Sequence, residues 1–302
     1  MEKSIIILDD DKAQAKGLSE ALGKVLVDYS FEAYYEEVHM IDAIENRFYT
    51  LAIVDIRMDK FHFNGIDLVK RIFEVNPFAK VLIISAFKDE YFLTIKDILL
   101  SGKVIDVIEK QPLSEWLPAL KGIIEKYFSE LDKDPSEINK ALLKYYADAK
   151  NETDIYKKGV LFEHFVSLIF QSFGYNEINK RVKDKSLNEV DLIIRNETND
   201  IFLGKFGKYI LIECKNKPDS KVSKNDFILF SAKLQNTSGL SELGIIATTG
   251  YIARTTYIEA VRTSASAKKI LFLSNPEFEQ LISAKDKKEE FKRIIDSQVK
   301  DN

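Results

Sequence analysis

Cysteine is almost missing from this chain of 302 residues, which contains Cys214 alone. A single thiol excludes an intramolecular disulfide and a zinc site built from paired thiolates. Long hydrophobic runs are also missing: the first apolar run, residues 4–8, meets three aspartates at once. A membrane span needs roughly 20 apolar residues. We therefore expect no signal peptide, no membrane anchor and a cytoplasmic location.

Charge is divided unevenly along the chain. Residues 1–150 hold 20 lysines and arginines against 27 aspartates and glutamates, a net of −7, and residues 151–302 hold 24 against 21, a net of +3. An acidic half suits metal or phosphate chemistry, and a mildly basic half is compatible with a polyanionic partner. At roughly 100 to 200 residues per domain, the length predicts two domains.

Short apolar runs alternate with helical periodicity in the first half. The runs IIIL, LAIVDI, KVLIIS and VIDVIE predict strands that are buried on both faces. Helices between them, at 13–27 and 66–73, and a last helix at 114–128, predict a doubly wound parallel sheet over residues 1–128. Ligands of such a sheet bind at the carboxyl ends of its strands.

The second half predicts another α/β domain, over residues 156–284. A polar helical stretch, residues 129–155, is expected to link the two domains, and residues 285–302 to form a charged C-terminal tail. The expected elements are helices at 159–173, 226–236 and 253–264 and strands at 189–195, 209–215, 243–249 and 269–273.

Polar residues follow the strands of the first domain at the ends that should converge. They are Asp9, Asp10, Asp55, Ser85 and Lys110. Carboxylates can hold Mg²⁺ and leave one of their number as a nucleophile toward phosphate. A hydroxyl and an ammonium would then hold the added phosphoryl oxygens. The alternative is that single aspartates after buried strands cap helices; Asp11 is assigned only to the loop.

These residues lie in sequence motifs that are similar to those of a known family. The run LDDDKAQAKGL, followed by VDIRM, ISA and EKQP, resembles the response-regulator receiver domain over residues 1–128. The resemblance implies a flavodoxin-like fold, Asp55 as the phospho-acceptor, and Asp9 and Asp10 as Mg²⁺ ligands beside it. It also implies that Ser85 and Lys110 sense the phosphate and that a cognate histidine kinase is the partner.

Several positions depart from the receiver pattern. Gln111 follows Lys110 where the family has proline, and Val107 stands at the usual aromatic switch position. Met58 lacks its usual following proline, and the stretch from there to Gly65 is longer than in the family. We expect phosphorylation to be intact and its readout to differ.

In the second domain, Glu213 and Lys215 are two residues apart on one expected strand, so alternation places them on one face. Cys214 should then point into the core. Charges on an otherwise apolar strand are costly unless they serve a site. With Asp191 from the paired strand, two carboxylates could bind Mg²⁺ and Lys215 could orient water, which is equipment for metal-assisted phosphodiester hydrolysis.

The pieces GVLFEHFVSLIFQSFGY, EVDLII, YILIECKN and GIIATTGYIARTTYIEA resemble the PD-(D/E)xK nuclease superfamily, most closely its Mrr-type restriction endonucleases. The resemblance implies a restriction-endonuclease-like α/β/α domain that cleaves DNA with Mg²⁺, for which Mn²⁺ can substitute. It implies that Asp191, Glu213 and Lys215 are catalytic and that Glu163 completes the metal site. Val190 replaces a common proline, and Glu213 replaces a frequent glutamine, which favours metal binding.

Other polar residues have two interpretations each. Glu163 is a metal ligand or a surface glutamate, and His164 is a general base or a structural histidine. Lys233 and Gln235 face the site or form a solvated helix face. The basic run that includes Lys180 and Arg181 contacts phosphates or is solvated.

The combined hypothesis is a response regulator with a metal-dependent DNA endonuclease output, controlled by phosphorylation of Asp55. Phosphorylation would pair two receivers into a homodimer, or the linker helix would hold the nuclease cleft shut. The alternatives are a phosphorylation-controlled nucleic-acid-binding module with a non-cleaving nuclease fold, and a scaffold with two vestigial sites. RNA stays open as a substrate.

Overall fold

The structure is a computed structural model with two compact units, Met1–Ile138 and Asn139–Asn302. None of the helices in its described part is long and apolar enough to cross a membrane. The described residues are 3–47, 49–76, 79–86, 98–99, 101–133, 136–175, 177–183, 189–198, 200–237, 239–263 and 268–300.

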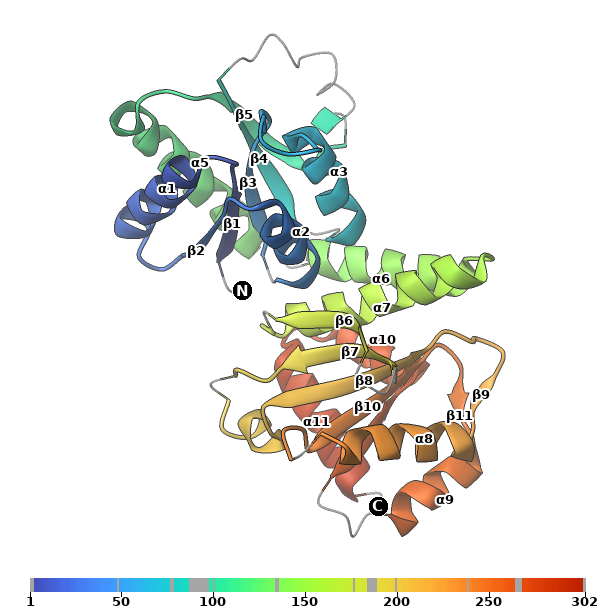
Figure 1. Ribbon diagram of the computed structural model, residues 1–302. Coiled ribbons are helices and arrows are strands. Elements are labelled where there is room, and N and C mark those ends of the chain that lie inside the picture. The colour runs from blue at the N-terminus through green and yellow to red at the C-terminus, as the bar shows by residue number, and fades with distance from the viewer. Residues whose placement is uncertain are drawn as a thin grey trace. The chain divides into compact units, whose positions relative to one another are not determined.

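The first unit is built on a parallel sheet of five strands in the order β2-β1-β3-β4-β5 (Figure 1). Four of the strands come from the apolar runs of the sequence, which confirms the predicted doubly wound sheet. The edge strand β2 and the helix α2 after it were not predicted. The strands are β1 (Ser4–Leu8), β2 (Ser30–Tyr34), β3 (Leu51–Asp55), β4 (Lys80–Ser85) and β5 (Val104–Glu109).

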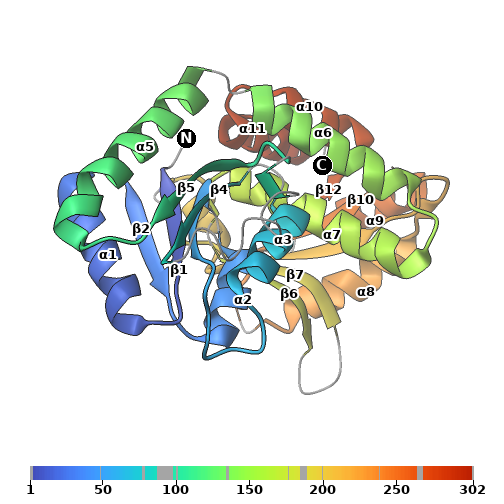
Figure 2. The ribbon, with the colours of Figure 1, turned by 90° about the horizontal axis from the view of Figure 1, so that it is seen from above.

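Helices cover both faces of this sheet, because successive strand residues point to opposite sides. Ile5 and Ile7 of β1 pack with α1 (Lys12–Val25) and α5 (Leu113–Lys133). Ile6 and Leu8 pack on the other face, with α2 (Glu37–Asn46) and α3 (Gly65–Val75). Figure 2 shows the sheet between these two pairs of helices. Strands β1, β3 and β4 are therefore buried on both faces, as their continuous apolar runs predict. The prediction was wrong for VIDVIE, because β5 is an edge strand without a fully buried residue.

The start of α3 lies directly against the end of β3. A Cβ atom added to Gly65 would be 1.9 Å from the backbone oxygen of Asp55, which no side chain can occupy. Asn64 caps the helix through a capping box with Asp67. The glycine thus allows the helix to begin beside the carboxyl end of β3, where Asp55 lies.

The second unit has a mixed sheet in the order β12-β10-β8-β7-β6. Strands β8, β10 and β12 are parallel, and β7 and β6 are antiparallel to their neighbours. A short parallel pair, β9 and β11, lies outside it. The strands are β6 (Ile178–Lys183), β7 (Glu189–Arg195), β8 (Tyr209–Lys215), β9 (Lys221–Val222), β10 (Leu243–Thr248), β11 (Tyr251–Ile252) and β12 (Lys269–Leu273).

Two helical layers enclose this sheet (Figure 1). Phe227 and Phe230 of α8 (Lys224–Gln235) form a core with Leu211 and Phe272 from the sheet, and α9 (Arg254–Arg262) packs beside α8. The other layer contains α7 (Ile155–Ser172), α10 (Asn275–Ser283) and α11 (Lys287–Lys300). This is the α/β/α arrangement expected of a restriction-endonuclease-like domain.

The helix α6 (Ser136–Asn151) packs within the second unit from Asn139 onward. The ring of Tyr146 lies 4.7 Å from that of Phe165 and 5.5 Å from that of Phe278. The sequence suggested a polar linker here, because the charged face of an amphipathic helix dominates its composition.

The stretch 285–302 contains the helix α11, in which Glu289, Arg293 and Asp296 are exposed and Lys287 is buried. Its apolar residues Phe291, Ile294 and Ile295 recur at helical spacing and are buried. Phe291 packs against the rings of Phe170 and Phe173, with centroids 5.4 Å away in both cases. The C-terminal helix is therefore part of the core of this unit.

Candidate functional site

In the first unit, three carboxylates converge at the carboxyl end of the sheet. Asp9 follows β1, Asp10 is next to it, and Asp55 is the last residue of β3. Each offers an oxygen within 4.8 Å of the oxygens of the other two. Among the described residues, no other group of three metal-ligating side chains meets this limit. Carboxylate oxygens are the ligands that Mg²⁺ prefers, so this donor set fits that cation.

Lys110 follows β5 and reaches the same cluster. Its Nζ donates to Asp55 Oδ2 at 2.7 Å and to Asp9 Oδ2 at 2.8 Å. Ser85 is the buried last residue of β4, the strand between β3 and β5. The structure therefore brings the predicted site residues together at the carboxyl end of the sheet, because parallel strands end on the same side.

Burial sets the electrostatics of this cluster. It raises the pKa of Asp55, and the charge of Asp9 acts in the same direction, while Lys110 opposes both. Burial alone would lower the pKa of Lys110, but its bonds to Asp55 and Asp9 raise it above the ordinary value. Lys110 therefore stays charged and compensates the two buried carboxylates.

Some contacts of this site could not be predicted from the sequence. Gln14 Oε1 accepts a third hydrogen bond from Lys110 Nζ at 2.8 Å. The backbone N–H of Lys60, in the long segment after Met58, donates to Asp10 Oδ2 at 3.1 Å. Asp11 caps α1 by accepting from the N–H groups of the first turn. The helix-cap alternative thus applies to Asp11, and no signal in the sequence marked Gln14 or Lys60.

In the second unit, the residues Asp191 and Glu213 lie on neighbouring antiparallel strands. The register pairs Leu192 with Ile212, which places Asp191 beside Glu213. Asp191 Oδ2 accepts a hydrogen bond of 2.7 Å from the backbone N–H of Cys214. Burial, followed by the charges of Glu213 and Glu163, raises the pKa of Asp191 to about 6. Asp191 forms no ion pair with a described side chain, and the charge of Lys215 only partly offsets the rise in its pKa. A divalent cation would relieve the repulsion from the two glutamates.

Glu213 lies between two ammonium groups. Lys215 Nζ donates to its Oε1 and Lys233 Nζ to its Oε2, both at 2.9 Å. Lys233 comes from α8, so α8 does face the site, whereas Gln235 is exposed. Burial alone would lower the pKa of Lys215, but Glu213 and Asp191 raise it. The predicted face shared by Glu213 and Lys215 is thus present, while Cys214 is half-buried.

Glu163 projects from α7 and is only 8% exposed. Both of its oxygens are bound by Arg181 of β6: Nε donates to Oε2 at 2.9 Å and Nη2 to Oε1 at 3.3 Å. Glu163 is therefore a buried, ion-paired residue and not a solvated surface glutamate. The neighbouring His164 has its Nδ1 3.3 Å from Lys180 Nζ. The basic run at 180–183 is a strand, which its many charges concealed.

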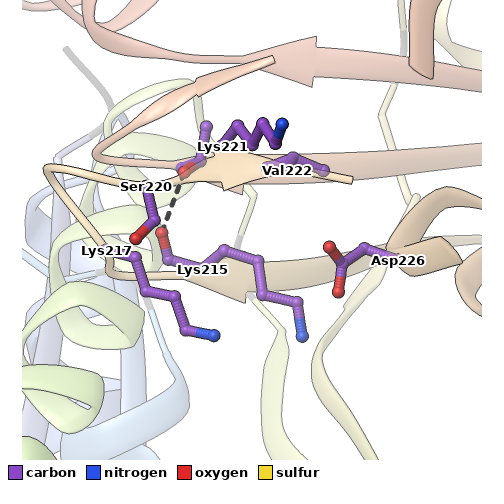
Figure 3. A pocket seen from close by; sticks show the side chains of 7 residues that line it. Lys215, Lys217, Ser220, Lys221, Val222 and Asp226 are labelled. Carbon is purple, nitrogen blue, oxygen red and sulfur yellow. Dashed lines mark hydrogen bonds between the residues drawn. The ribbon is translucent and has the colours of Figure 1, made fainter. Parts of the chain in front are cut away.

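A basic pocket adjoins Lys215 on the side of the α8 N-terminus (Figure 3). Figure 3 shows Lys215 and Lys217 extending in the same direction, with the carboxylate of Asp226 facing them. Lys217 and Lys221 are exposed, and neither ammonium forms an ion pair with a described residue. The pocket is lined by Lys215, Lys217, Ser220, Lys221, Val222, Asp226 and Thr248.

At Gly250 the backbone around this pocket packs too closely to leave room for a side chain. A Cβ atom there would lie 2.1 Å from the backbone oxygen of Ser220 and 2.5 Å from that of Lys217. Asn216 holds the same turn: its Nδ2 donates to the backbone oxygens of Ala149 and Lys158, each at 2.7 Å. Its Oδ1 accepts from Thr249 Oγ1 at 2.8 Å. The segment after Lys215 is thus tightly held.

Two family models match the chain. Residues 5–115 match the response regulator receiver domain, and residues 158–293 match the Mrr-type restriction endonuclease model. A search of curated proteins found no match.

The chain is also similar to solved response regulators. A CheY-like receiver domain protein from Methanospirillum hungatei JF-1 is 22% identical, with a TM-score of 0.36, over 43% of this chain and 99% of that one. The Thermotoga maritima protein TrrA, in complex with Mg²⁺-BeF, is 20% identical, with a TM-score of 0.32, over 40% and 98%. The phosphorylated cyanobacterial phytochrome response regulator RcpA is 19% identical, with a TM-score of 0.37, over 43% and 96%.

Each family model falls within one unit of the structure and covers the residues that form its polar site. The chain therefore combines a response regulator receiver domain, at residues 5–115, with a restriction endonuclease domain of the Mrr type, at residues 158–293.

Proposed function

We propose that the protein is a cytoplasmic response regulator whose output is a metal-dependent DNA endonuclease, controlled by phosphorylation of Asp55. The observation that carries the proposal is the cluster of Asp191, Glu213 and Lys215 on two neighbouring strands. It supplies two carboxylates, one half-buried and one buried, for a cation and an ammonium beside them.

In the receiver domain, Asp55 would be the nucleophile toward the phosphoryl group that a histidine kinase provides. Asp9 and Asp10 would hold Mg²⁺ with Asp55. Lys110 donates to Asp55 Oδ2, which supports the proposal that its ammonium would bind the oxygens of the added phosphate. Ser85, at the end of the adjacent strand, would supply a hydroxyl to the same group.

In the nuclease domain, Asp191 and Glu213 would hold Mg²⁺ or Mn²⁺. A bound divalent cation polarises the scissile phosphate and lowers the pKa of a water molecule. Lys215 would position the attacking water and stabilise the negative charge that develops on the phosphate. Lys233 holds the far oxygen of Glu213 and would orient that carboxylate.

Nicking of supercoiled plasmid with Mg²⁺ or Mn²⁺ tests the nuclease proposal. We expect Lys215→Ala and Asp191→Asn to lower the rate by about 100-fold or more, as loss of one charge-stabilising group does in other enzymes. Lys285→Ala, which removes an exposed lysine before α11, is the matched control and should cleave normally. Cleavage by Lys215→Ala at the wild-type rate would refute the assignment. DNA that is bound but never nicked would indicate the non-cleaving module.

A small phosphodonor, acetyl phosphate, tests the control by the receiver. We expect it to change the nicking rate of the wild type and to leave Asp55→Asn unaffected. Asp59→Asn is the matched control, because Asp59 is an exposed aspartate that pairs with Arg57 on the surface. The same response in wild type and Asp55→Asn would contradict phosphorylation of Asp55 as the control.

A further inference from the structure

Arg181 has an unusual backbone. Its φ of 52° is the one positive value among the non-glycine residues that the structure describes. This conformation costs an L residue about 1 kcal/mol or more. The β6–β7 register pairs Lys180 with Leu192 and Val182 with Val190, so Arg181 stands opposite Asp191. The fold keeps a strained arginine at the level of the proposed metal site.

The Arg181 side chain donates hydrogen bonds to both oxygens of Glu163 and also contacts Tyr156. Its Nη1 donates to the hydroxyl of Tyr156 at 3.1 Å, and the guanidinium lies 5.1 Å from the centre of that ring. Tyr156 is 69% exposed. The guanidinium therefore has a second contact, with an exposed ring, that does not depend on Glu163.

The two partners differ in their access to solvent. The side chain of Arg181 is 33% exposed, while that of Glu163 is 11% exposed. A planar guanidinium binds a phosphate through the same pair of N–H groups that it uses for a carboxylate. A buried carboxylate that loses its partner is strongly destabilised unless another cation replaces it. Separation of Arg181 from Glu163 is therefore favourable only when an anion binds Arg181 and a cation binds Glu163 at the same time.

We propose that Arg181 is a positioning residue that couples nucleic-acid binding to completion of the metal site. Without nucleic acid, Arg181 holds Glu163. When a backbone phosphate takes the guanidinium, Glu163 becomes free to join Asp191 and Glu213 as a ligand of the divalent cation. This inference rests on the proposed nuclease function, and it gives Glu163 a role that depends on substrate. Because coupling is reciprocal, the cation must also tighten binding of DNA.

The test measures Mn²⁺ binding by calorimetry, with and without a phosphorothioate DNA duplex that resists cleavage. The full chain carries Asp9→Asn and Asp10→Asn, so that the receiver does not bind the metal. We expect the duplex to tighten Mn²⁺ binding at least about 5-fold, the lower end of typical coupling. Arg181→Gly, in which glycine tolerates the positive φ, should bind Mn²⁺ tightly without DNA and lose the coupling. Arg181→Lys should retain part of it.

Glu163→Gln should bind Mn²⁺ more weakly and show no coupling. Arg195→Ala is the control, since Arg195 is the last residue of β7 and forms surface ion pairs with Glu177 and Glu197. Full coupling in Arg181→Gly or in Glu163→Gln would overturn the proposal. Cleavage of plasmid by a wild type that shows no coupling would refute this inference alone. Absence of both Mn²⁺ binding and cleavage would refute the nuclease function as well.

Discussion

At the scale of residues, Lys110 and Lys215 show how a partly buried ammonium stays charged. Both lie beside carboxylates that raise the lysine pKa against the effect of burial. Each ammonium therefore places a positive charge next to a carboxylate, Asp55 or Glu213, that would react with phosphate or hold the divalent cation. Alternation along β8 was enough to predict that Lys215 and Glu213 share one face of the strand.

Other residues of the sites could not be predicted in this way. The Arg181–Glu163 ion pair joins a strand to a helix and depends on a positive φ that no sequence pattern encodes. Gln14 reaches Lys110 across the sheet edge. A sequence shows which side chains are polar, but these pairs depend on the packing of distant segments.

The lysines of the basic pocket lead to a prediction about DNA affinity. Lys217 and Lys221 are exposed and unpaired among the described residues, so their charges can replace counterions on DNA. We expect Lys217→Ala with Lys221→Ala to weaken DNA binding and to reduce the slope of log K against log salt by about 2. Fluorescence anisotropy over a salt series measures this slope. Lys285→Ala should leave it unchanged, and an unchanged slope in the double variant would exclude phosphate contacts here.

At the scale of elements, burial explains which segments the sequence predicted. Strands β1, β3 and β4 are buried on both faces and appear as continuous apolar runs. Strand β2 lies at the sheet edge, and none of its residues is fully buried. Its sequence SFEAY therefore carries neither a continuous apolar run nor clear alternation. Strand β6 is also an edge strand, which allows it to be rich in basic residues.

Packing of α6 predicts a large effect of Tyr146→Ala. Tyr146 is buried between Phe165 and Phe278, and its hydroxyl donates to Asn275. We expect the substitution to lower the free energy of unfolding of the second unit by about 3 kcal/mol. Leu143→Ala, at a position 54% exposed on the same helix, should change it by about 0.5 kcal/mol or less. Urea unfolding compares the two, and equal effects would indicate that α6 is not anchored.

The junction of α6, α10 and α11 contains a buried ammonium that predicts a pH dependence. Lys287 donates to Asn139 Oδ1 and to the backbone oxygens of Ile282 and Ala284. Burial lowers its pKa to about 8. A lowered lysine pKa means that the unfolded chain binds more protons between pH 8 and the ordinary pKa. The resulting penalty is complete below about pH 8 and declines as the pH rises above it.

We therefore expect stability to rise from pH 8 to 9.5 by at most about 1.4 kcal/mol per pH unit from this group. In Lys287→Met this contribution should vanish, which denaturant unfolding at several pH values can measure. Lys285→Met, two residues earlier and exposed, should keep it. If Lys287→Met showed the same pH dependence as the wild type, the pKa of Lys287 would not be lowered in the folded protein.

At the scale of the whole molecule, the chain joins two units that each have their own core and polar site. The proposed homodimer predicts that phosphorylation increases the mass in solution. We expect light scattering after treatment with acetyl phosphate to show a doubled mass for the wild type and an unchanged one for Asp55→Asn. One mass under all conditions would contradict control by receiver pairing.

Two deletions separate that mechanism from inhibition by α6. A chain of residues 139–302 keeps all but the first three residues of α6 and lacks the receiver, and a chain of residues 152–302 lacks both. Greater nuclease activity in the first chain would indicate inhibition by the receiver. Greater activity in the second alone would indicate that α6 closes the site. The boundary at Asn139 comes from the structure, because the sequence showed only a polar helical stretch there.

Asn216 has a consequence for how the second unit opens. One amide side chain, next to Lys215, connects the end of α6, the helix α7 and the loop after β10. Each of the three segments forms its own hydrogen bond with Asn216, so opening of the chain at Asn216 removes all three bonds together. Backbone amides at the end of α6 and at the end of β8 should therefore exchange with deuterium at a common rate, as one cooperative unit. In Asn216→Ala we expect the two rates to separate.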